Sequence, residues 1–76
     1  SESRLSHLFR ERLATTVMDY LLAVRVSRAK TLLLTTSMTC TEIAFETGFN
    51  DPSYFTRCFR RSVGSSPREF RKNQNR

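Results

Sequence analysis

Glycine, histidine and cysteine are all scarce in this 76-residue sequence, which has two glycines, one histidine and two cysteines. Two isolated glycines cannot build a glycine-rich loop for nucleotide phosphates, and a lone histidine offers no catalytic pair or metal cluster. We therefore expect a protein that is not an enzyme and that needs no cofactor and no metal ion.

The two cysteines, Cys40 and Cys58, lie within helical apolar patterns and not in a Cys-x-x-Cys motif. This placement argues against both a metal site and a disulfide framework and predicts buried, reduced thiols. The chain also lacks a hydrophobic run long enough for a membrane span or a signal peptide. We expect a soluble, cytoplasmic protein with no membrane partner.

Charge is abundant and unevenly distributed. Thirteen Lys and Arg against seven Asp and Glu give a net charge of +6, and residues 47–76 hold seven of those cations but only two of the carboxylates. A basic half of this kind favours nucleic acid or another anionic surface as partner. A solvated basic tail is the simpler alternative.

Helix boundaries are well marked. A hydroxyl precedes a carboxylate by three residues at Thr16/Asp19, Thr39/Glu42 and Ser66/Glu69, which is capping-box spacing. Asp51-Pro52 is a further helix start, and Gly48 and Gly64 stand where helices end. The pattern predicts an all-α fold of about five helices, at 2–12, 17–35, 40–47, 52–62 and 67–72, with no strand.

One segment of the sequence occurs twice. Ser3-Arg4-Leu5-Ser6-His7-Leu8-Phe9-Arg10 aligns with Ser53-Tyr54-Phe55-Thr56-Arg57-Cys58-Phe59-Arg60, and each copy has one apolar face and one small or basic face at helical spacing. A helix that keeps hydroxyls and cations on its outer face can lie close to an anion. The repeat therefore predicts two equivalent surfaces for the same kind of partner.

Residues 39–59 have the form of a helix-turn-helix, with Ile43 and Ala44 facing inward and a turn after Gly48. The outer face of its second helix offers groups that can reach base edges in a major groove, and Arg57 can bind guanine in a bidentate manner. We expect base contacts from Pro52, Ser53, Thr56 and Arg57. Phosphate contacts are expected from Arg60, Arg61 and Arg68.

A long central helix joins the two copies. Its expected apolar stripe, which we interpret as a structural strut, comprises Val17, Tyr20, Leu21, Val24, Ala29, Leu32 and Leu33. A helix of about 18 residues spans about 27 Å, which approaches the ~34 Å repeat of B-DNA. The two polar faces could therefore meet successive major grooves on one side of a duplex.

The stretches Thr39–Ala44, Gly48–Arg61 and Gly64–Arg71 resemble the signature of the AraC/XylS family of bacterial transcription regulators, and the first copy with Tyr20-Leu21, Arg25 and Ala29 resembles the preceding part of the same domain. The resemblance implies homeodomain-like helix-turn-helix units joined by a linker helix. It implies sequence-specific binding to double-stranded DNA in transcription regulation, with activation and a contact to RNA polymerase as further expectations. The family's base-reading positions would fall on Ser3, Ser6, His7 and Arg10 in the first copy and on Pro52, Ser53, Thr56 and Arg57 in the second.

Two departures from the family pattern stand in the first copy. Ala14 occupies the place that glycine has in the second copy, as Gly64, so a left-handed turn there would be strained. About two helices of the family's domain also have no counterpart before Ser1.

We expect an N-terminally truncated, partial DNA-binding domain over 1–76 without its effector domain. Its expected parts are the first recognition helix at 1–14, a linker helix at 16–36, the second helix-turn-helix at 39–63 and a C-terminal helix at 66–73.

One other function class remains open. A basic helical protein-interaction module would use the same cationic face to bind an acidic partner, without sequence-specific DNA binding. RNA binding is less favoured, because the aromatic residues lie mostly on apolar stripes and not on an exposed stacking platform. The sequence identifies neither an operator nor an effector ligand nor an oligomeric state.

Overall fold

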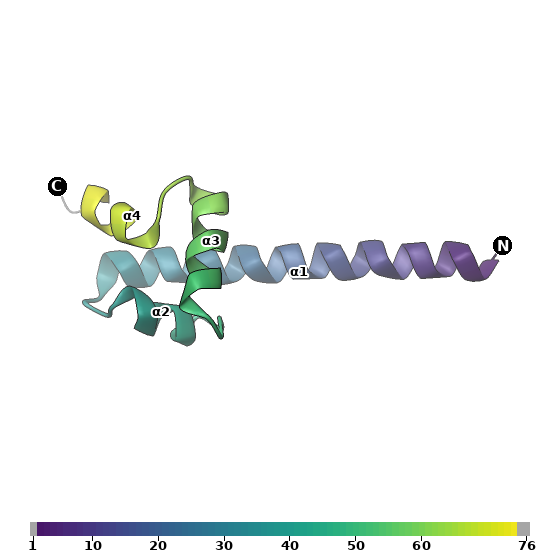
Figure 1. The fold of residues 1–76 in the computed structure, drawn as a ribbon, viewed down its shortest axis with the longest axis horizontal. Coiled ribbons are helices and arrows are strands. Elements are labelled where there is room, and N and C mark those ends of the chain that lie inside the picture. Colours follow the sequence, from purple (N-terminus) through teal and green to yellow (C-terminus); the bar gives the residue numbers. More distant parts are fainter. Residues whose placement is uncertain (1, 75–76) are drawn as a thin grey trace.

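The computed structural model describes the backbone of residues 2–74 and the side chains of residues 16–74. In this range the chain forms four helices and no strand: α1 (Glu2–Thr35), α2 (Cys40–Glu46), α3 (Pro52–Val63) and α4 (Pro67–Gln74). The expected all-α fold is confirmed. Figure 1 shows α2 and α4 on either side of the C-terminal half of α1, with α3 crossing it, while the N-terminal half of α1 extends beyond all three. The molecule measures 57 × 20 × 18 Å.

The helix break expected between residues 12 and 17 is wrong. Glu2–Thr35 is one continuous helix of 34 residues, so the number of helices is four and not five. The segment contains neither glycine nor proline, and Leu13 and Ala14 are strong helix formers. Thr16 therefore lies inside a helix and does not begin one. Gly64, the counterpart of Ala14, does end its helix, with φ of 97°.

Of the seven residues expected on the apolar stripe of α1, only Ala29, Leu32 and Leu33, in its C-terminal half, pack in the core. Val26, Ala29 and Leu33 are buried, and Leu22 and Leu32 pack partly against them. The residues expected on the stripe nearer the N-terminus are exposed instead: Val17, Tyr20, Leu21 and Val24. These residues are exposed because α2, α3 and α4 pack only along the C-terminal half of α1, as Figure 1 shows.

Helix α2, the turn and α3 are built by local signals. The hydroxyl of Thr39 accepts from the Glu42 N–H at 3.1 Å, and the Glu42 carboxylate accepts from the Thr39 N–H at 3.0 Å, which completes the predicted capping box. After α2 the Phe49 N–H donates to Ala44 O at 2.9 Å and the Gly48 N–H to Phe45 O at 3.2 Å. This is a Schellman motif with Gly48 in the left-handed region, at φ of 99°.

Helix α3 begins as predicted at Asp51-Pro52. The Asp51 carboxylate accepts from the Ser53 N–H at 3.0 Å, and proline at the first helical position has no N–H left unpaired. The hydroxyl of Ser66 accepts from the Glu69 N–H at 3.1 Å at the start of α4. Three of the four predicted helix starts are thus present.

The core lies where α1, α2 and α3 meet. Ile43 and Ala44 have no exposed surface, and Phe55 and Phe59 are 1% and 0% exposed, as their spacing predicted. The rings continue as a chain of edge and tilted contacts, with Phe49 to Phe55 at 5.1 Å and Phe55 to Phe59 at 5.8 Å between centroids. Burial of large rings on one side of α3 leaves its other side facing solvent.

Helix α4 is held to the end of α1 by Arg71. Its guanidinium donates to one backbone carbonyl in the last turn of α1, Leu33 O at 3.0 Å, and to two just beyond the helix, Thr36 O at 3.1 Å and Met38 O at 2.6 Å. The last carbonyls of a helix have no partner within the helix, so this side chain supplies one. Phe70 contacts Phe59 at 5.6 Å between ring centroids and thereby joins α4 to α3.

Candidate nucleic-acid interface

The solvent-facing side of α3 is polar and basic. With Phe55 and Phe59 turned into the core, its exposed side chains are Ser53, Tyr54, Arg57, Arg60, Arg61 and Ser62. At 100° per residue, Arg57 lies at the centre of this side and directly opposite the buried rings. The face is a single convex helix surface carrying three guanidinium groups, a shape and charge suited to a groove lined by phosphates.

Among the residues predicted to read bases, Ser53 and Arg57 are exposed, whereas Pro52 and Thr56 are half-buried on the edge of the face. The Thr56 hydroxyl donates to Pro52 O at 3.0 Å. The Thr56 hydroxyl proton is therefore used in a hydrogen bond within the helix, and the hydroxyl oxygen can still accept a hydrogen bond. The structure thus brings all four side chains to one helix but gives the central position to Arg57.

Tyr54 belongs to this face, although the aromatic residues were expected to lie mostly on apolar stripes. Its side chain is 41% exposed, and its ring lies 5.8 Å from the Arg57 guanidinium. A hydrogen bond with Cys58 raises the pKa of the Tyr54 hydroxyl. The signal that could have found it is its position three residues before Arg57, where helical side chains become neighbours.

The three cations predicted to contact phosphates lie at the margins of the face. Arg60 Nη2 is 3.7 Å from Glu69 Oε1, and both side chains are 62% exposed, so this pair is weak and open to exchange for a phosphate. Arg68 is exposed in the first turn of α4. Both belong to the C-terminal side of the helix-turn-helix.

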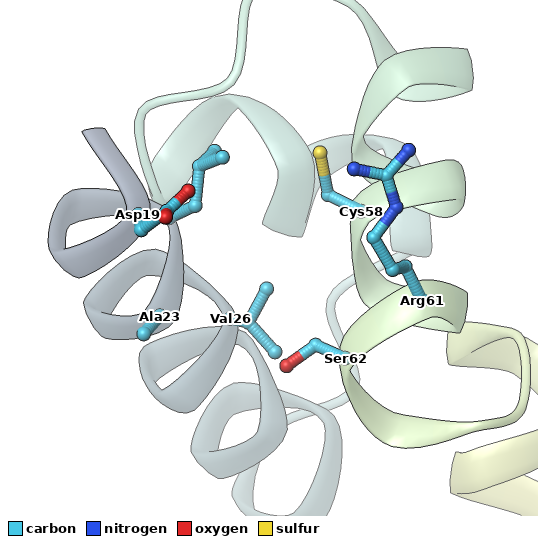
Figure 2. Close-up of a pocket in the computed structure, with 7 residues that line it drawn as sticks. Asp19, Ala23, Val26, Cys58, Arg61 and Ser62 are labelled. Atoms are coloured by element: carbon cyan, nitrogen blue, oxygen red, sulfur yellow. The ribbon is translucent and has the colours of Figure 1, made fainter. Parts of the chain in front are cut away.

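Arg61 lies beside a groove between α1 and α3 with a volume of about 240 Å³. Figure 2 shows Asp19 on the α1 side and Arg61 on the α3 side, with Val26 between them. The labelled lining residues are Asp19, Ala23, Val26, Cys58, Arg61 and Ser62. The Asp19 carboxylate and the Arg61 guanidinium thus line opposite walls of this groove.

The base-reading residues predicted for the first copy are Ser3, Ser6, His7 and Arg10, and these lie outside the described side chains. Their backbone is part of α1. Their contacts with bases therefore stay predictions.

Cys40 and Cys58 are free and half-buried, which is less than the full burial expected of them. Cys58 borders the groove of Figure 2, which explains its partial exposure. Over the described residues no three His, Cys, Asp or Glu side chains gather as a metal site, and no helix has the length and apolar character to cross a membrane.

Comparison with known families decides which kind of helix-turn-helix this is. A family model described as a helix-turn-helix domain matches residues 1–73. The chain belongs to this helix-turn-helix family. Its AraC-type character, indicated by the signature residues, is confirmed by relatives that include an arabinose operon regulatory protein and a helix-turn-helix transcriptional activator.

Two curated relatives match almost the whole AraC-type helix-turn-helix chain. The arabinose operon regulatory protein of Salmonella typhimurium is 46% identical over 71 residues, which cover 93% of this chain and 25% of the relative. The transcriptional activator RhaR of Cronobacter sakazakii is 38% identical over 71 residues, again 93% of this chain and 25% of the relative. The chain thus spans about a quarter of the length of these curated relatives.

A solved structure has the same fold. The C-terminal domain of the two-component response regulator yesN from Fusobacterium nucleatum superposes with a TM-score of 0.72 at 38% identity, covering 93% of this chain and 69% of that one. The match covers most of both chains, so the arrangement of the AraC-type helix-turn-helix helices is shared.

Proposed function

We propose that this chain binds double-stranded DNA in a sequence-specific manner, as part of a bacterial transcription regulator, with α3 in the major groove. The observation that carries the proposal is the exposed side of α3, where Arg57 stands at the centre of a basic face on a helix-turn-helix scaffold. An α-helix fits the width of the major groove, and arginine is the side chain that most often reads guanine. Membership of a family of operon regulators supports the same conclusion.

The contacts of α3 divide into two kinds. Arg57, Ser53, Thr56 and Pro52 are proposed to meet base edges, because they lie nearest the start and centre of the exposed helix. Arg60, Arg61 and Arg68 are proposed to meet phosphates, because they lie at its margins and on α4. Phosphate contacts supply affinity and register, and base contacts supply the sequence preference.

A second reading surface is proposed on the N-terminal part of α1, through Ser3, Ser6, His7 and Arg10. The support is the repeat of sequence between this segment and α3. A continuous α1 would act as the linker that sets the spacing between the two surfaces, at 1.5 Å per residue. The two surfaces would then face successive major grooves.

RNA polymerase is proposed as a further partner, because RhaR, a relative, is named as a transcriptional activator. Regulation of a bacterial operon would place the protein in the cytoplasm. Both statements concern the regulator as a whole.

The proposal is tested by fluorescence anisotropy with a labelled random-sequence duplex across a salt series, followed by selection of bound sequences from a random duplex pool. We expect binding whose log K falls linearly with log salt, together with an enriched sequence. A basic module for acidic protein partners would give neither an enriched sequence nor measurable duplex binding at moderate salt. That outcome would contradict the proposal.

A further inference from the structure

Four side chains form a continuous series of contacts from α1 to the centre of the exposed face of α3. Arg25 Cζ lies 5.9 Å from the ring centroid of Phe49, the Phe49 centroid lies 6.0 Å from that of Tyr54, and the Tyr54 centroid lies 5.8 Å from Arg57 Cζ. Each separation is within the range over which cations attract ring faces or rings attract each other. We call these four residues the Arg25–Arg57 stack.

The inner half of the stack is fixed by burial. Phe49 is 2% exposed and also contacts the buried Phe55 ring at 5.1 Å. Arg25 is half-buried against the turn, and its Nε would lie 3.1 Å from a Cβ added at Gly48. The Phe49 ring is therefore held between the Phe55 ring of the core and the Arg25 guanidinium, and it presents a fixed surface to Tyr54.

The outer half of the stack is exposed. Tyr54 is 41% exposed and rests on Phe49, and Arg57 is exposed and rests on Tyr54. An exposed arginine samples many rotamers, and ordering it when it meets a base opposes binding. A planar guanidinium over a ring has fewer of these rotamers open to it.

We propose that Tyr54 is a positioning residue for Arg57, holding the guanidinium in a restricted orientation before DNA arrives and so sharpening base discrimination without touching the base itself. The inference rests on the proposed role of Arg57 as a base-reading side chain. Phe49 and Arg25 supply the fixed support at the other end. The stack thereby links α1 and the turn to the reading position on α3.

The test uses the 76-residue chain and a duplex obtained by selection on the wild-type protein. Affinities are measured by anisotropy for this duplex, for its variants at the most strongly selected G·C base pair, which is the one proposed to contact Arg57, and for a random duplex. The proteins compared are wild type, Tyr54→Phe, Tyr54→Leu, Arg57→Ala and the double variant Tyr54→Leu/Arg57→Ala. Tyr20→Leu is the matched control, because Tyr20 is 69% exposed on α1, away from the stack.

We expect Arg57→Ala to lower discrimination at that base pair about 5- to 150-fold. Tyr54→Leu should lower it about two- to fivefold with little change on the random duplex, which is the effect of losing an exposed cation–π contact. Tyr54→Phe, which keeps the ring, should behave as wild type, and Tyr54→Leu should cause no further loss when Arg57 is already alanine. Circular dichroism confirms that each variant is folded.

The outcomes separate the inference from the function on which it rests. If Arg57→Ala destroys discrimination but Tyr54→Leu leaves it unchanged, or lowers affinity for all duplexes equally, the positioning role is overturned and the reading role stands. If Tyr54→Phe loses as much as Tyr54→Leu, the hydroxyl acts directly and positioning is again overturned. If Arg57→Ala leaves discrimination intact, the assignment of Arg57 fails, and the inference fails with it.

Discussion

Arg71, in α4, donates a 2.6 Å hydrogen bond from Nη1 to the carbonyl oxygen of Met38, which lies 33 residues earlier in the chain. The same guanidinium bonds the carbonyls of Leu33 and Thr36. One cation of the basic half is therefore committed to the fold, where it joins α4 to the end of α1 and is not free for DNA.

Replacement of Arg71 should accordingly reduce stability. We expect Arg71→Ala to lower the free energy of unfolding by about 2–3 kcal/mol, because a charged donor is lost and three part-buried carbonyls lose their partner. Arg71→Lys should recover little, since one ammonium cannot match the guanidinium fork. Urea denaturation measures both, with the exposed Lys72→Ala as control, expected within about 0.5 kcal/mol of wild type. An Arg71→Lys variant as stable as wild type would show that charge alone is what matters.

The two glycines offer a matched pair. Gly48 and Gly64 have φ of 99° and 97°, so alanine at either place must adopt the left-handed conformation, which costs about 1–2 kcal/mol. A Cβ at Gly48 would also meet Arg25 Nε at 3.1 Å, whereas one at Gly64 meets nothing within 4 Å. Gly48→Ala should therefore lower the melting temperature more than Gly64→Ala. Equal losses would mean that Arg25 gives way freely.

The capping box of α2 predicts a pH dependence. The hydrogen bond from the Thr39 backbone lowers the pKa of the Glu42 carboxyl. A lowered folded-state pKa contributes stability that is present above the unfolded-state value of about 4.3 and is lost as pH falls through the folded-state value. The stability advantage of wild type over Glu42→Ala should hold from neutral pH to about pH 5 and shrink in more acid solution. An advantage that does not change down to pH 2 would contradict this.

Protection from amide exchange should rise along α1. Val17, Tyr20 and Leu21 are exposed, while Ala29 and Leu33 are buried under the other helices. Amides at 17–21 should therefore exchange faster than those at 29–33 because they can open without disrupting the core. Uniform protection that depends on protein concentration would show that a second molecule covers the first half of α1.

Local sequence signals determined most of the helix boundaries. The Thr39/Glu42 box, the Asp51-Pro52 start and the left-handed glycine at residue 64 each involve groups a few residues apart, so the sequence alone predicted them. The same spacing at Thr16/Asp19 gave a wrong prediction of a helix start. A threonine three residues before a carboxylate also occurs inside helices, and here Leu13 and Ala14 favour a helix that continues through Thr16.

Contacts between residues far apart in the chain could not be predicted from the sequence. The sequence does not distinguish Arg71 from its basic neighbours, because its partners come from the far end of α1. The exposure of Val17, Tyr20, Leu21 and Val24 likewise depends on which half of α1 the other helices cover. The same holds for Tyr54, whose ring lies between the core residue Phe49 and the exposed Arg57. The other residues on the exposed face of α3 could be predicted from the sequence, because helical spacing alone places Phe55 and Phe59 on the side opposite Arg57.

The central claim is that α3 reads DNA sequence through Arg57, and Arg60 provides its closest control, being an exposed arginine one turn further along the same helix. The decisive measurement is the affinity of Arg57→Ala and Arg60→Ala for the selected and the random duplex across a salt series. We predict that Arg57→Ala loses about 1–3 kcal/mol on the selected duplex and little on the random one. Arg60→Ala should weaken both about equally and make the slope of log K against log salt shallower by about 0.9. If Arg57→Ala instead lowers both affinities by the same factor with the base preference intact, the claim is contradicted.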